Sequence, residues 1–343
     1  MPRRERMSAV DTAWLRMDRP TNLMMIVGVM VFAQRMDFAR LRATIADRLL
    51  GRYRRFRQCA VQEVGGAFWE DDPDFDLDAH LRRRALPKGS GKAGLQALAS
   101  ELAVQPLNPG KPLWRFDLIE DYEGGSAMVV RIHHSIADGI ALISVTMSIV
   151  DGGTEPPKRR KKGPGGAEDW IADTLIKPFT GMTVKALDLV GESAAKSLHL
   201  LLDPEKAVQH GLAGSADAAR LGYQLVSDAA SLALMPDDSP TGLKGVPGTQ
   251  KRVAWCPPLP LDEVKAIGKA LNCSVNDVLL SCVAGAIGSY LRHQGEDTEG
   301  KEIRAMIPVN LRPIEEAWKL GNHFGLVPLV LPIGITNPVE RVY

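Results

Sequence analysis

Cysteine is scarce in this sequence, and the cysteines present are not arranged for metal or redox chemistry. They are Cys59, Cys256, Cys273 and Cys282. No two of them form a Cys-x-x-Cys pair, and none stands beside a histidine at metal-ligand spacing. The pattern argues against a structural zinc site and favours buried, reduced thiols in a cytoplasmic protein.

Long apolar runs and a secretion signal are missing as well. The longest apolar stretch, residues 23–33, is too short to cross a bilayer and suits a buried strand. The basic residues at positions 1–6 are not followed by the apolar core and small-residue cleavage site of a signal peptide. We therefore expect neither a transmembrane span nor secretion.

An excess of charge of either sign is also absent. The formal net charge is +1, so no overall field attracts nucleic acid, and we expect no nucleic-acid partner. The 343 residues exceed the size of a single core, which stops growing at about 250–300 residues. We predict two domains, residues 1–152 and 249–343, joined by a linker with crossover helices over 153–248.

Strands alternate with helices in the first predicted domain. The apolar periodicity predicts strands over 22–33, 56–64, 114–120 and 126–132, and helices over 37–50 and 94–103. The last two strands are expected to form a hairpin. This alternation is typical of an α/β layered domain.

The rest of the chain changes composition twice. Residues 152–166 predict an exposed connector, and 168–235 predict two or three helices. Further on we expect strands over 251–256, 303–309 and 324–331, a helix over 261–271, and a long helix from its cap Ser274 to Tyr290. Because the chain stops shortly after the last strand, we expect the second domain to be incomplete.

The most informative stretch is a histidine pair followed by an aspartate and a glycine. His133, His134, Asp138 and Gly139 form the pattern His-His-x-x-x-Asp-Gly, between an apolar strand and a predicted buried helix over 140–149. Histidine titrates near neutral pH and can take a proton from a hydroxyl or thiol. Adjacent strand residues point to opposite faces, so at most one of the two histidines faces a given cleft.

The spacing alone leaves catalytic and structural roles for the pair open. Metal binding is the weakest interpretation, because neighbouring histidines on a strand rarely chelate one ion and no third ligand is evident. Gly139 is expected to allow a tight backbone path that a side chain would block. There is no Gly-x-Ser-x-Gly elbow for a nucleophile.

With segments elsewhere, the motif resembles the bacterial wax ester synthase/diacylglycerol acyltransferase family of the CoA-dependent acyltransferase superfamily. The matching segments, in the family's order, are Ser-Ala-Val-Asp-Thr-Ala-Trp-Leu at 8–15, Pro-Thr-Asn-Leu-Met at 20–24, Leu-Asn-Pro-Gly-Lys-Pro-Leu-Trp at 107–114, Val-Asn-Asp-Val-Leu-Leu at 275–280, Pro-Val-Asn-Leu-Arg-Pro at 308–313 and Gly-Asn-His-Phe-Gly at 321–325. The resemblance implies a two-domain α/β architecture like that of chloramphenicol acetyltransferase, with the active site in a channel between the domains.

The resemblance also implies an O-acyltransferase. It would move a fatty acyl group from acyl-CoA to a long-chain alcohol, giving a wax ester, or to diacylglycerol, giving triacylglycerol. His134 would be the general base that takes the hydroxyl proton and then protonates the CoA thiolate. His133 would support the geometry, Asp138 would orient the loop, for example through an arginine, and Gly139 would permit the turn. Acyl-CoA is a substrate, and neither a bound cofactor nor a metal is implied.

Two further segments are candidate substrate-binding residues. Asn276 and Asp277 lie in the first turn of a capped helix, where they can simply start the helix. Alternatively, Asn276 shapes the site or donates to a developing oxyanion. Pro112, Leu113 and Trp114 are expected to turn into a strand with Trp114 in the core, with substrate contact as the second interpretation.

Basic residues suggest where anionic groups would bind. Arg52, Arg54, Arg55 and Arg57 can meet CoA phosphates or an anionic membrane, although a solvated face is the favoured interpretation. The cluster over 158–162 is a better candidate for attraction to a membrane. The family's lipid substrates imply a cytoplasmic protein with peripheral contact to the inner membrane or lipid inclusions.

Two other functions stay open. The first is a condensation-type acyltransferase, which uses a carrier-protein thioester and an amine or alcohol acceptor. The second is a catalytically inactive, truncated homologue that binds lipid.

Overall fold

The structure is a computed structural model that describes residues 4–153, 237–310, 320–322 and 324–343. These residues divide into two compact units, each described here by itself. The first holds 4–153, 247–256 and 320–322, and the second holds 237–246, 257–310 and 324–343. The units interleave along the chain, in contrast to the consecutive regions expected. The predicted connector beyond residue 153 and the helices predicted over 168–235 lie outside the described residues.

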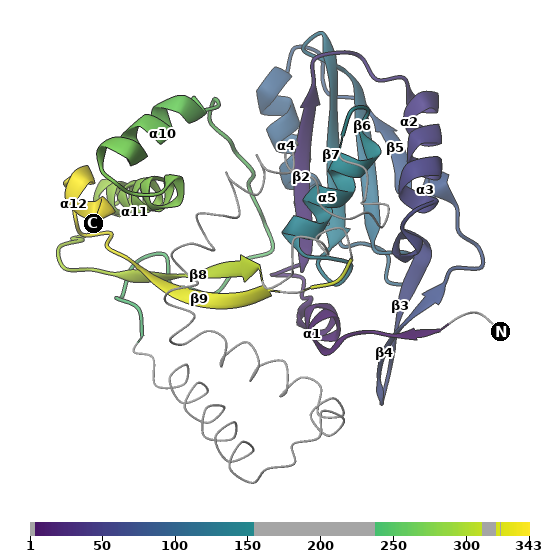
Figure 1. Cartoon of the computed structure of the whole chain (residues 1–343), viewed down its shortest axis with the longest axis horizontal. Coiled ribbons are helices and arrows are strands. Elements are labelled where there is room, and N and C mark those ends of the chain that lie inside the picture. Colours follow the sequence, from purple (N-terminus) through teal and green to yellow (C-terminus); the bar gives the residue numbers. More distant parts are fainter. Residues whose placement is uncertain (1–3, 154–236, 311–319, 323) are drawn as a thin grey trace, which may run out of the picture. The chain divides into compact units, whose positions relative to one another are not determined.

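The first unit is built on a four-stranded sheet with the order β2-β7-β6-β5 (Figure 1). Its strands are β2 (Met25–Phe32), β5 (Leu81–Arg84), β6 (Trp114–Tyr122) and β7 (Gly125–His133). Strands β6 and β7 form the predicted hairpin, closed by Glu123 at φ 50° and Gly124 at φ 85°, the left-handed pair that a two-residue turn requires. Because β7 is paired on both sides and buried along its whole length, it supports rigidly the residues that follow it.

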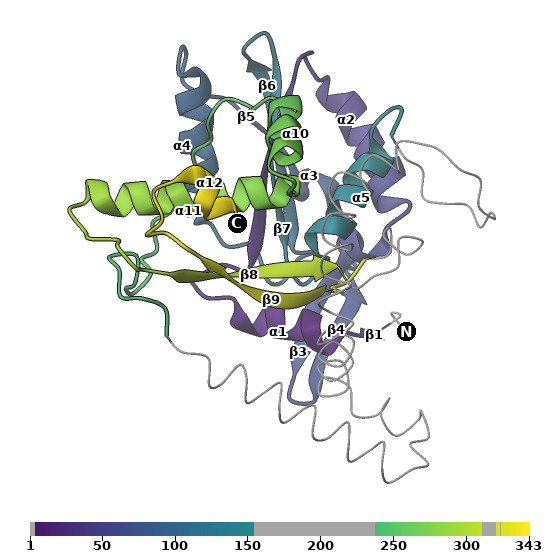
Figure 2. The ribbon, with the colours of Figure 1, turned by 60° about the vertical axis from the view of Figure 1, so that its left-hand side comes forward.

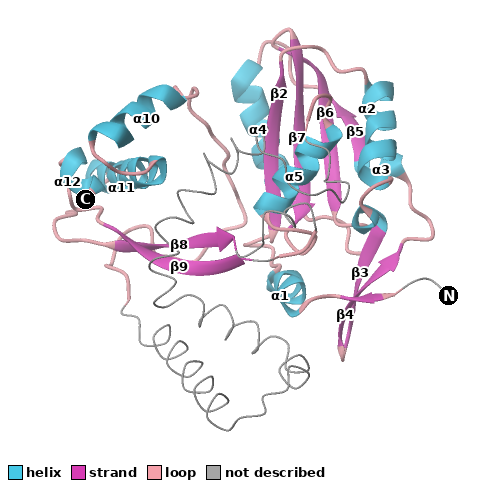
Figure 3. Cartoon of the chain, viewed as in Figure 1, coloured by secondary structure: helices cyan, strands magenta, loops and turns pink. Residues whose placement is uncertain are grey.

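Helices cover both faces of this sheet, which confirms the predicted α/β domain (Figure 3). One face carries α2 (Phe38–Thr44), a π-helical turn (Ile45–Leu50) and α5 (Gly139–Ile149), and the other carries α4 (Gly91–Ala103). On β7, Val130 and Ile132 pack into the cluster under α2 and α5, whereas Ala127 and Val129 pack into the cluster under α4. The alternation has the period of two that a strand between two layers requires.

A three-stranded sheet with the order β1-β4-β3 adjoins the N-terminal helix. The elements are β1 (Glu5–Arg6), α1 (Ala9–Met17), β3 (Gln58–Glu63), β4 (Gly66–Asp71) and the short helix α3 (Leu77–His80). The strand predicted over 56–64 begins later than expected, because Arg54–Arg57 form a 3₁₀ turn. Helix α1 begins where the hydroxyl of Ser8 accepts a hydrogen bond from the amide of Asp11 at 3.0 Å.

In the second unit the described residues form two strands and three helices (Figure 2). Strands β8 (Ile303–Asn310) and β9 (Phe324–Leu331) are antiparallel, and the helices are α10 (Leu261–Ala270), α11 (Val275–His293) and α12 (Pro338–Val342). These elements confirm the strands and helices predicted there. Within the described residues no single helix is long and apolar enough to cross a membrane; α10 and α11 satisfy length and composition only as a pair, bent by 98°.

Two expectations about local structure are wrong. Residues 251–256 form no strand; instead the amide of Val253 donates to the hydroxyl of Ser100 at 2.7 Å, and Trp255 packs against the cluster under α4. This segment is held by contacts with side chains, so its backbone forms no strand-to-strand hydrogen bonds. The cysteines are free, as expected, but Cys256 and Cys282 are exposed rather than buried.

Buried histidines predict a loss of stability in mild acid. Burial lowers the pKa of both His80 and His133 below its ordinary value. Below about pH 6.5 these two histidines therefore bind protons more readily in the unfolded chain than in the folded chain. The free energy of unfolding falls as the pH drops further. Above that pH both states are neutral at these residues and the effect vanishes.

Urea unfolding between pH 8 and pH 5 measures this dependence. We expect the His80→Gln variant to lose less stability than the wild type over this range, and the exposed His293→Gln variant to match the wild type. Identical slopes for the wild type and His80→Gln would contradict the assignment to His80.

Candidate active site

The histidine pair lies where the central strand of the first sheet ends. The amide of His133 donates to the carbonyl of Leu113 at 2.9 Å, and the amide of His134 donates to the carbonyl of Met24 at 2.8 Å. The residues that directly precede β6 and β2 thus hold the backbone of the pair. The predicted hairpin thus places the histidine pair where β7 ends, between that strand and α5 as expected.

The two neighbouring histidines have different surroundings. The side chain of His133 is almost fully buried; its Nδ1 accepts the amide of Ser135 at 3.1 Å, and its Nε2 lies 3.9 Å from a carboxylate oxygen of Asp18. Burial lowers the pKa of His133, which keeps the ring neutral. His134 is only half-buried. The histidine suited to packing is therefore His133, and the more accessible one is His134.

Two residues far from His134 in sequence contact its ring, and a third orients one of them. The indole of Trp14 stacks on it with centroids 4.2 Å apart and planes at 13°. The side-chain oxygen of Asn322 lies 3.2 Å from Nδ1 of His134. The nitrogen of the same amide donates to Asp11 at 2.6 Å and to the carbonyl of His134 at 2.8 Å. This cluster of Asp11, Trp14, His134 and Asn322 is the candidate site.

Sequence reasoning did not assign Asp11, Trp14 or Asn322 to the site, although each lies in a segment that matched the family. Asp11 and Trp14 are three residues apart on α1, a spacing that places both on one face of a helix. That spacing was the feature of the sequence that could have placed both residues in one site. The carboxyl of Asp11 is 4% exposed, and burial raises its pKa against the hydrogen bonds from Asn322 and Ser8.

Asp138 holds the loop after the histidines in place. Its carboxylate caps α5 by accepting the amide of Ala141 at 2.9 Å, and its own amide donates to the carbonyl of Gly321 at 3.3 Å. Ala137 and Gly321 also form a parallel bridge. The expected orienting role of Asp138 is thus exercised through a helix cap, and these contacts bring the segment containing Asn322 to the loop. An arginine partner stays a prediction.

The expectation for Gly139 is wrong. This residue is the first of α5 and has no positive φ, and a Cβ atom built on it would meet nothing within 4 Å in the part of the chain that the structure describes. A side chain would not block the backbone path. The glycine therefore leaves open space at the start of α5, beside the loop that carries His134.

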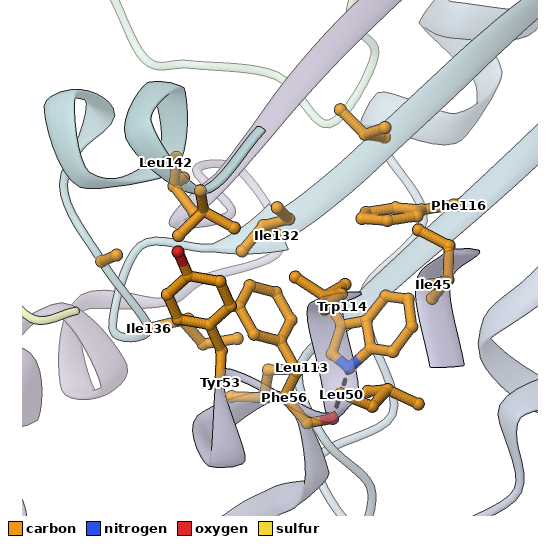
Figure 4. Packing of buried hydrophobic residues seen from close by; sticks show 14 of the residues in the cluster. Ile45, Leu50, Tyr53, Phe56, Leu113, Trp114, Phe116, Ile132, Ile136 and Leu142 are labelled. Carbon is orange, nitrogen blue, oxygen red and sulfur yellow. Dashed lines mark hydrogen bonds between the residues drawn. The ribbon is translucent and has the colours of Figure 1, made fainter. Parts of the chain in front are cut away.

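Pro112, Leu113 and Trp114 are all buried. Trp114 is 1% exposed, and its indole nitrogen donates to the carbonyl of Phe56 at 2.8 Å (Figure 4). The ring of His80 stacks on the indole with centroids 4.7 Å apart. The expectation that Trp114 packs in the core is confirmed. A substrate contact for the three residues stays a prediction.

Asn276 and Asp277 belong to the second unit, in the first turn of α11. The carboxylate of Asp277 accepts the amide and the hydroxyl of Ser274, both at 2.8 Å, and the hydroxyl of Ser274 accepts the amide of Asp277. This capping box confirms the helix start. Roles in substrate binding or oxyanion stabilisation stay predictions for both residues.

Three of the four arginines near position 54 bond to the protein itself, the first being Arg52, which donates to the carbonyl of Ser148 at 3.0 Å. Arg54 pairs with Asp71, and Arg55 pairs with Glu5 at 2.9 Å and lies over the ring of Trp69 at 4.3 Å. These contacts account for both guanidinium groups without a ligand. The lysine and arginine cluster over 158–162 lies outside the described residues.

The thiol of Cys59 is held in its protonated form. Burial, with a contribution from Asp72, raises the pKa of Cys59 to about 11, so its thiolate is scarce at neutral pH. Among the described residues no three His, Cys, Asp or Glu side chains group as metal ligands.

Sequence comparison finds related proteins over most of the chain. A family described as wax ester synthase/diacylglycerol acyltransferase catalytic domain matches residues 7–279. A putative diacylglycerol O-acyltransferase of Mycobacterium tuberculosis is 28% identical over 276 residues, which cover 80% of this chain and 55% of that protein. Another from the same organism is 28% identical over 352 residues, covering 98% of this chain and 66% of that protein. The chain thus spans only part of the length of these relatives.

Solved structures show which fold the chain shares. A wax ester synthase/diacylglycerol acyltransferase from Marinobacter aquaeolei VT8 matches with a TM-score of 0.58 at 19% identity, covering 98% of this chain and 68% of that one. The starter condensation domain of rhizomide synthetase, solved in complex with C8-CoA, matches with a TM-score of 0.54 at 15% identity, covering 96% of this chain and 66% of that one.

Proposed function

The chain belongs to the wax ester synthase/diacylglycerol acyltransferase family, and from that membership we propose that it transfers a fatty acyl group from acyl-CoA to a hydroxyl acceptor. The acceptor is a long-chain alcohol or diacylglycerol. The observation that carries the proposal is the position of His134, half-buried at the end of a buried strand and contacted by Trp14 and Asn322.

His134 acts as a general base and then as a general acid in the proposed reaction. Its imidazole takes the proton of the acceptor hydroxyl while the hydroxyl oxygen attacks the thioester carbonyl carbon. The tetrahedral intermediate collapses, the carbon–sulfur bond breaks, and the imidazolium returns the proton to the departing CoA sulfur. The products are an ester and free CoA, with no covalent acyl-enzyme. Acyl-CoA is consumed as a substrate, and none of these proposed steps uses a bound cofactor.

The geometry supports this role for His134 over His133. A base must approach the proton it abstracts to within about 2.6–3.2 Å, directly or through one water. His133 is 3% exposed, with both ring nitrogens directed toward Ser135 and Asp18, whereas His134 keeps partial exposure. His133 therefore supports the turn, and His134 is the residue that a substrate can reach.

The substrates also suggest where the protein works. Long-chain alcohols, diacylglycerols and their esters partition into lipid phases, so the proposal includes peripheral contact with a membrane or a lipid inclusion. The basic residues over 158–162 are the candidates for that contact, since each basic residue near anionic lipid contributes about 1 kcal/mol.

A condensation-type acyltransferase is the second candidate, because condensation domains share the fold at TM-scores of 0.50 to 0.54. Such an enzyme takes its acyl group from a carrier-protein thioester. The match of residues 7–279 to the wax ester synthase/diacylglycerol acyltransferase family favours the acyl-CoA donor.

An assay of CoA release tests the proposal. The purified chain is given palmitoyl-CoA with hexadecanol, with a diacylglycerol, or with no acceptor, and in parallel an acyl carrier-protein thioester with an amine. We expect acceptor-dependent release of CoA and formation of ester. Turnover of the carrier-protein thioester alone would support the condensation-type enzyme instead. Lipid binding without turnover of any donor would indicate the non-catalytic homologue.

A further inference from the structure

We propose that Asn322, oriented by Asp11, holds the imidazole of His134 in the tautomer that carries its proton on Nδ1. The tautomer itself follows from hydrogen-bond geometry, and its catalytic meaning rests on the proposed function. Asn322 and Asp11 are thus positioning residues, which act on the reaction through His134.

The orientation of the Asn322 amide follows from its neighbours. One end of the amide faces two oxygens, a carboxylate oxygen of Asp11 at 2.6 Å and the carbonyl oxygen of His134 at 2.8 Å. A carbonyl oxygen can only accept, so the amide nitrogen, with its two donors, belongs at this end. The reversed amide would set oxygen against oxygen at both contacts and lose both hydrogen bonds.

The opposite end of the amide then determines the tautomer. It presents its oxygen to Nδ1 of His134 at 3.2 Å. That oxygen is an acceptor only, so Nδ1 must be the donor and carry the proton. In a neutral ring the lone pair that accepts a proton is then on Nε2.

Burial and backbone contacts hold this arrangement in place. Asp11 is 4% and Asn322 is 6% exposed, so water competes little for their hydrogen bonds. The residue before Asn322, Gly321, is bridged to Ala137 in the loop that follows the histidines. Trp14, one turn along α1 from Asp11, lies flat on the ring of His134 and limits its rotation. Helix α1 therefore orients the amide and the ring together.

His133 provides an internal contrast. The amide of Ser135 donates to its Nδ1 at 3.1 Å, and the hydroxyl of Ser135, which can also donate, lies 2.8 Å from the same nitrogen. Nδ1 is therefore an acceptor and the proton belongs on Nε2, which lies 3.9 Å from a carboxylate oxygen of Asp18. Two adjacent histidines are thus held in opposite tautomers by different partners. The contrast makes the proposal measurable within one spectrum.

The tautomer of His134 matters because it selects the basic nitrogen. With the proton on Nδ1, the Nε2 atom takes the proton of the hydroxyl, and the imidazolium that forms keeps its Nδ1–H directed at Asn322. When the orienting partner is lost, the ring spends part of its time with the wrong nitrogen deprotonated. In a serine-protease triad such a change of tautomer costs about 10⁴-fold in kcat.

Nitrogen-15 NMR of the full chain with labelled histidine tests the tautomer directly. Long-range ¹H–¹⁵N spectra at about pH 8, where ordinary histidines are neutral, separate a protonated from an unprotonated ring nitrogen. The sequence has 7 histidines, and spectra of His134→Gln and His133→Gln assign the two of interest. We expect Nδ1–H for His134 and Nε2–H for His133 in the wild type.

Variants then test the cause. In Asn322→Ala we expect the His134 signals to move toward Nε2–H while those of His133 stay. Asp11→Ala is expected to give part of that change, and Asp11→Asn to restore the wild-type tautomer, because an amide oxygen still accepts from Asn322. Gln62→Ala, which removes an exposed amide, is the matched control and leaves the signals unchanged.

An Nε2–H tautomer of His134 in the wild type would overturn the proposal without any variant, and so would an unchanged tautomer in folded Asn322→Ala. Because the spectra need no turnover, this failure is distinct from a failure of the proposed acyl transfer. In the active chain we expect Asn322→Ala to lower kcat by at least about tenfold with KM little changed. A wild-type kcat alongside an altered tautomer would overturn the catalytic meaning.

Discussion

Replacement of His134 by alanine is expected to abolish measurable acyl transfer, with a loss of roughly 10²–10⁴-fold in kcat. The variant removes the imidazole that the proposed reaction uses first as a general base and then as a general acid. Its fold should survive, because the ring is half-buried and the backbone bond to Met24 is kept. Steady-state CoA release, with circular dichroism to check folding, measures both expectations.

His133→Ala is the matched comparison for this prediction. Its side chain is buried and holds the turn through Ser135, so we expect reduced stability but measurable transfer in the folded fraction. Equal kcat for the wild type and His134→Ala would refute the assignment of the base. The reverse order, with His133→Ala inactive although folded, would move the assignment to the other histidine.

Replacement of Trp114 by alanine is expected to lower the free energy of unfolding by about 3–5 kcal/mol. The indole is 1% exposed, donates a hydrogen bond to Phe56 and is stacked by His80, so its removal leaves a cavity and an acceptor without its donor. Urea unfolding followed by circular dichroism measures the loss. Tyr290→Ala, at an aromatic residue of α11 that is 54% exposed, is the control and should change stability by about 0.5 kcal/mol or less.

The Trp114 variant also decides between the two interpretations of the Pro-Leu-Trp segment. A core residue changes stability and affects activity only through the fraction folded. If Trp114→Ala kept wild-type stability and raised KM for acyl-CoA or the acceptor, the segment would contact substrate instead.

Elements whose signals are local could be predicted from the sequence. The hairpin of β6 and β7 follows from two alternating apolar runs around Glu123 and Gly124, and the start of α11 follows from Ser274 and Asp277. Each of these signals depends on residues a few positions apart, so no knowledge of the rest of the fold is needed.

The strand predicted over 251–256 shows where local reasoning fails. Its composition suits a strand, but a strand exists only where a neighbour completes its hydrogen bonds. Here the amide of Val253 meets a serine hydroxyl on α4, a partner more than a hundred residues away in sequence. The expectation that a side chain at Gly139 would block the backbone path was wrong for a related reason. The space around a residue can be read only from the packed structure.

The sequence by itself determined the α/β character, the histidine pair at the end of a strand, and the family. Periodicity and short motifs depend only on residues that are near one another in the sequence. Only the tertiary structure decided which groups surround His134. Asn322 and Asp11 are separated by 311 positions and meet through one hydrogen bond. No short-range pattern records such a contact, because it exists only after the chain has folded and excluded water from around it.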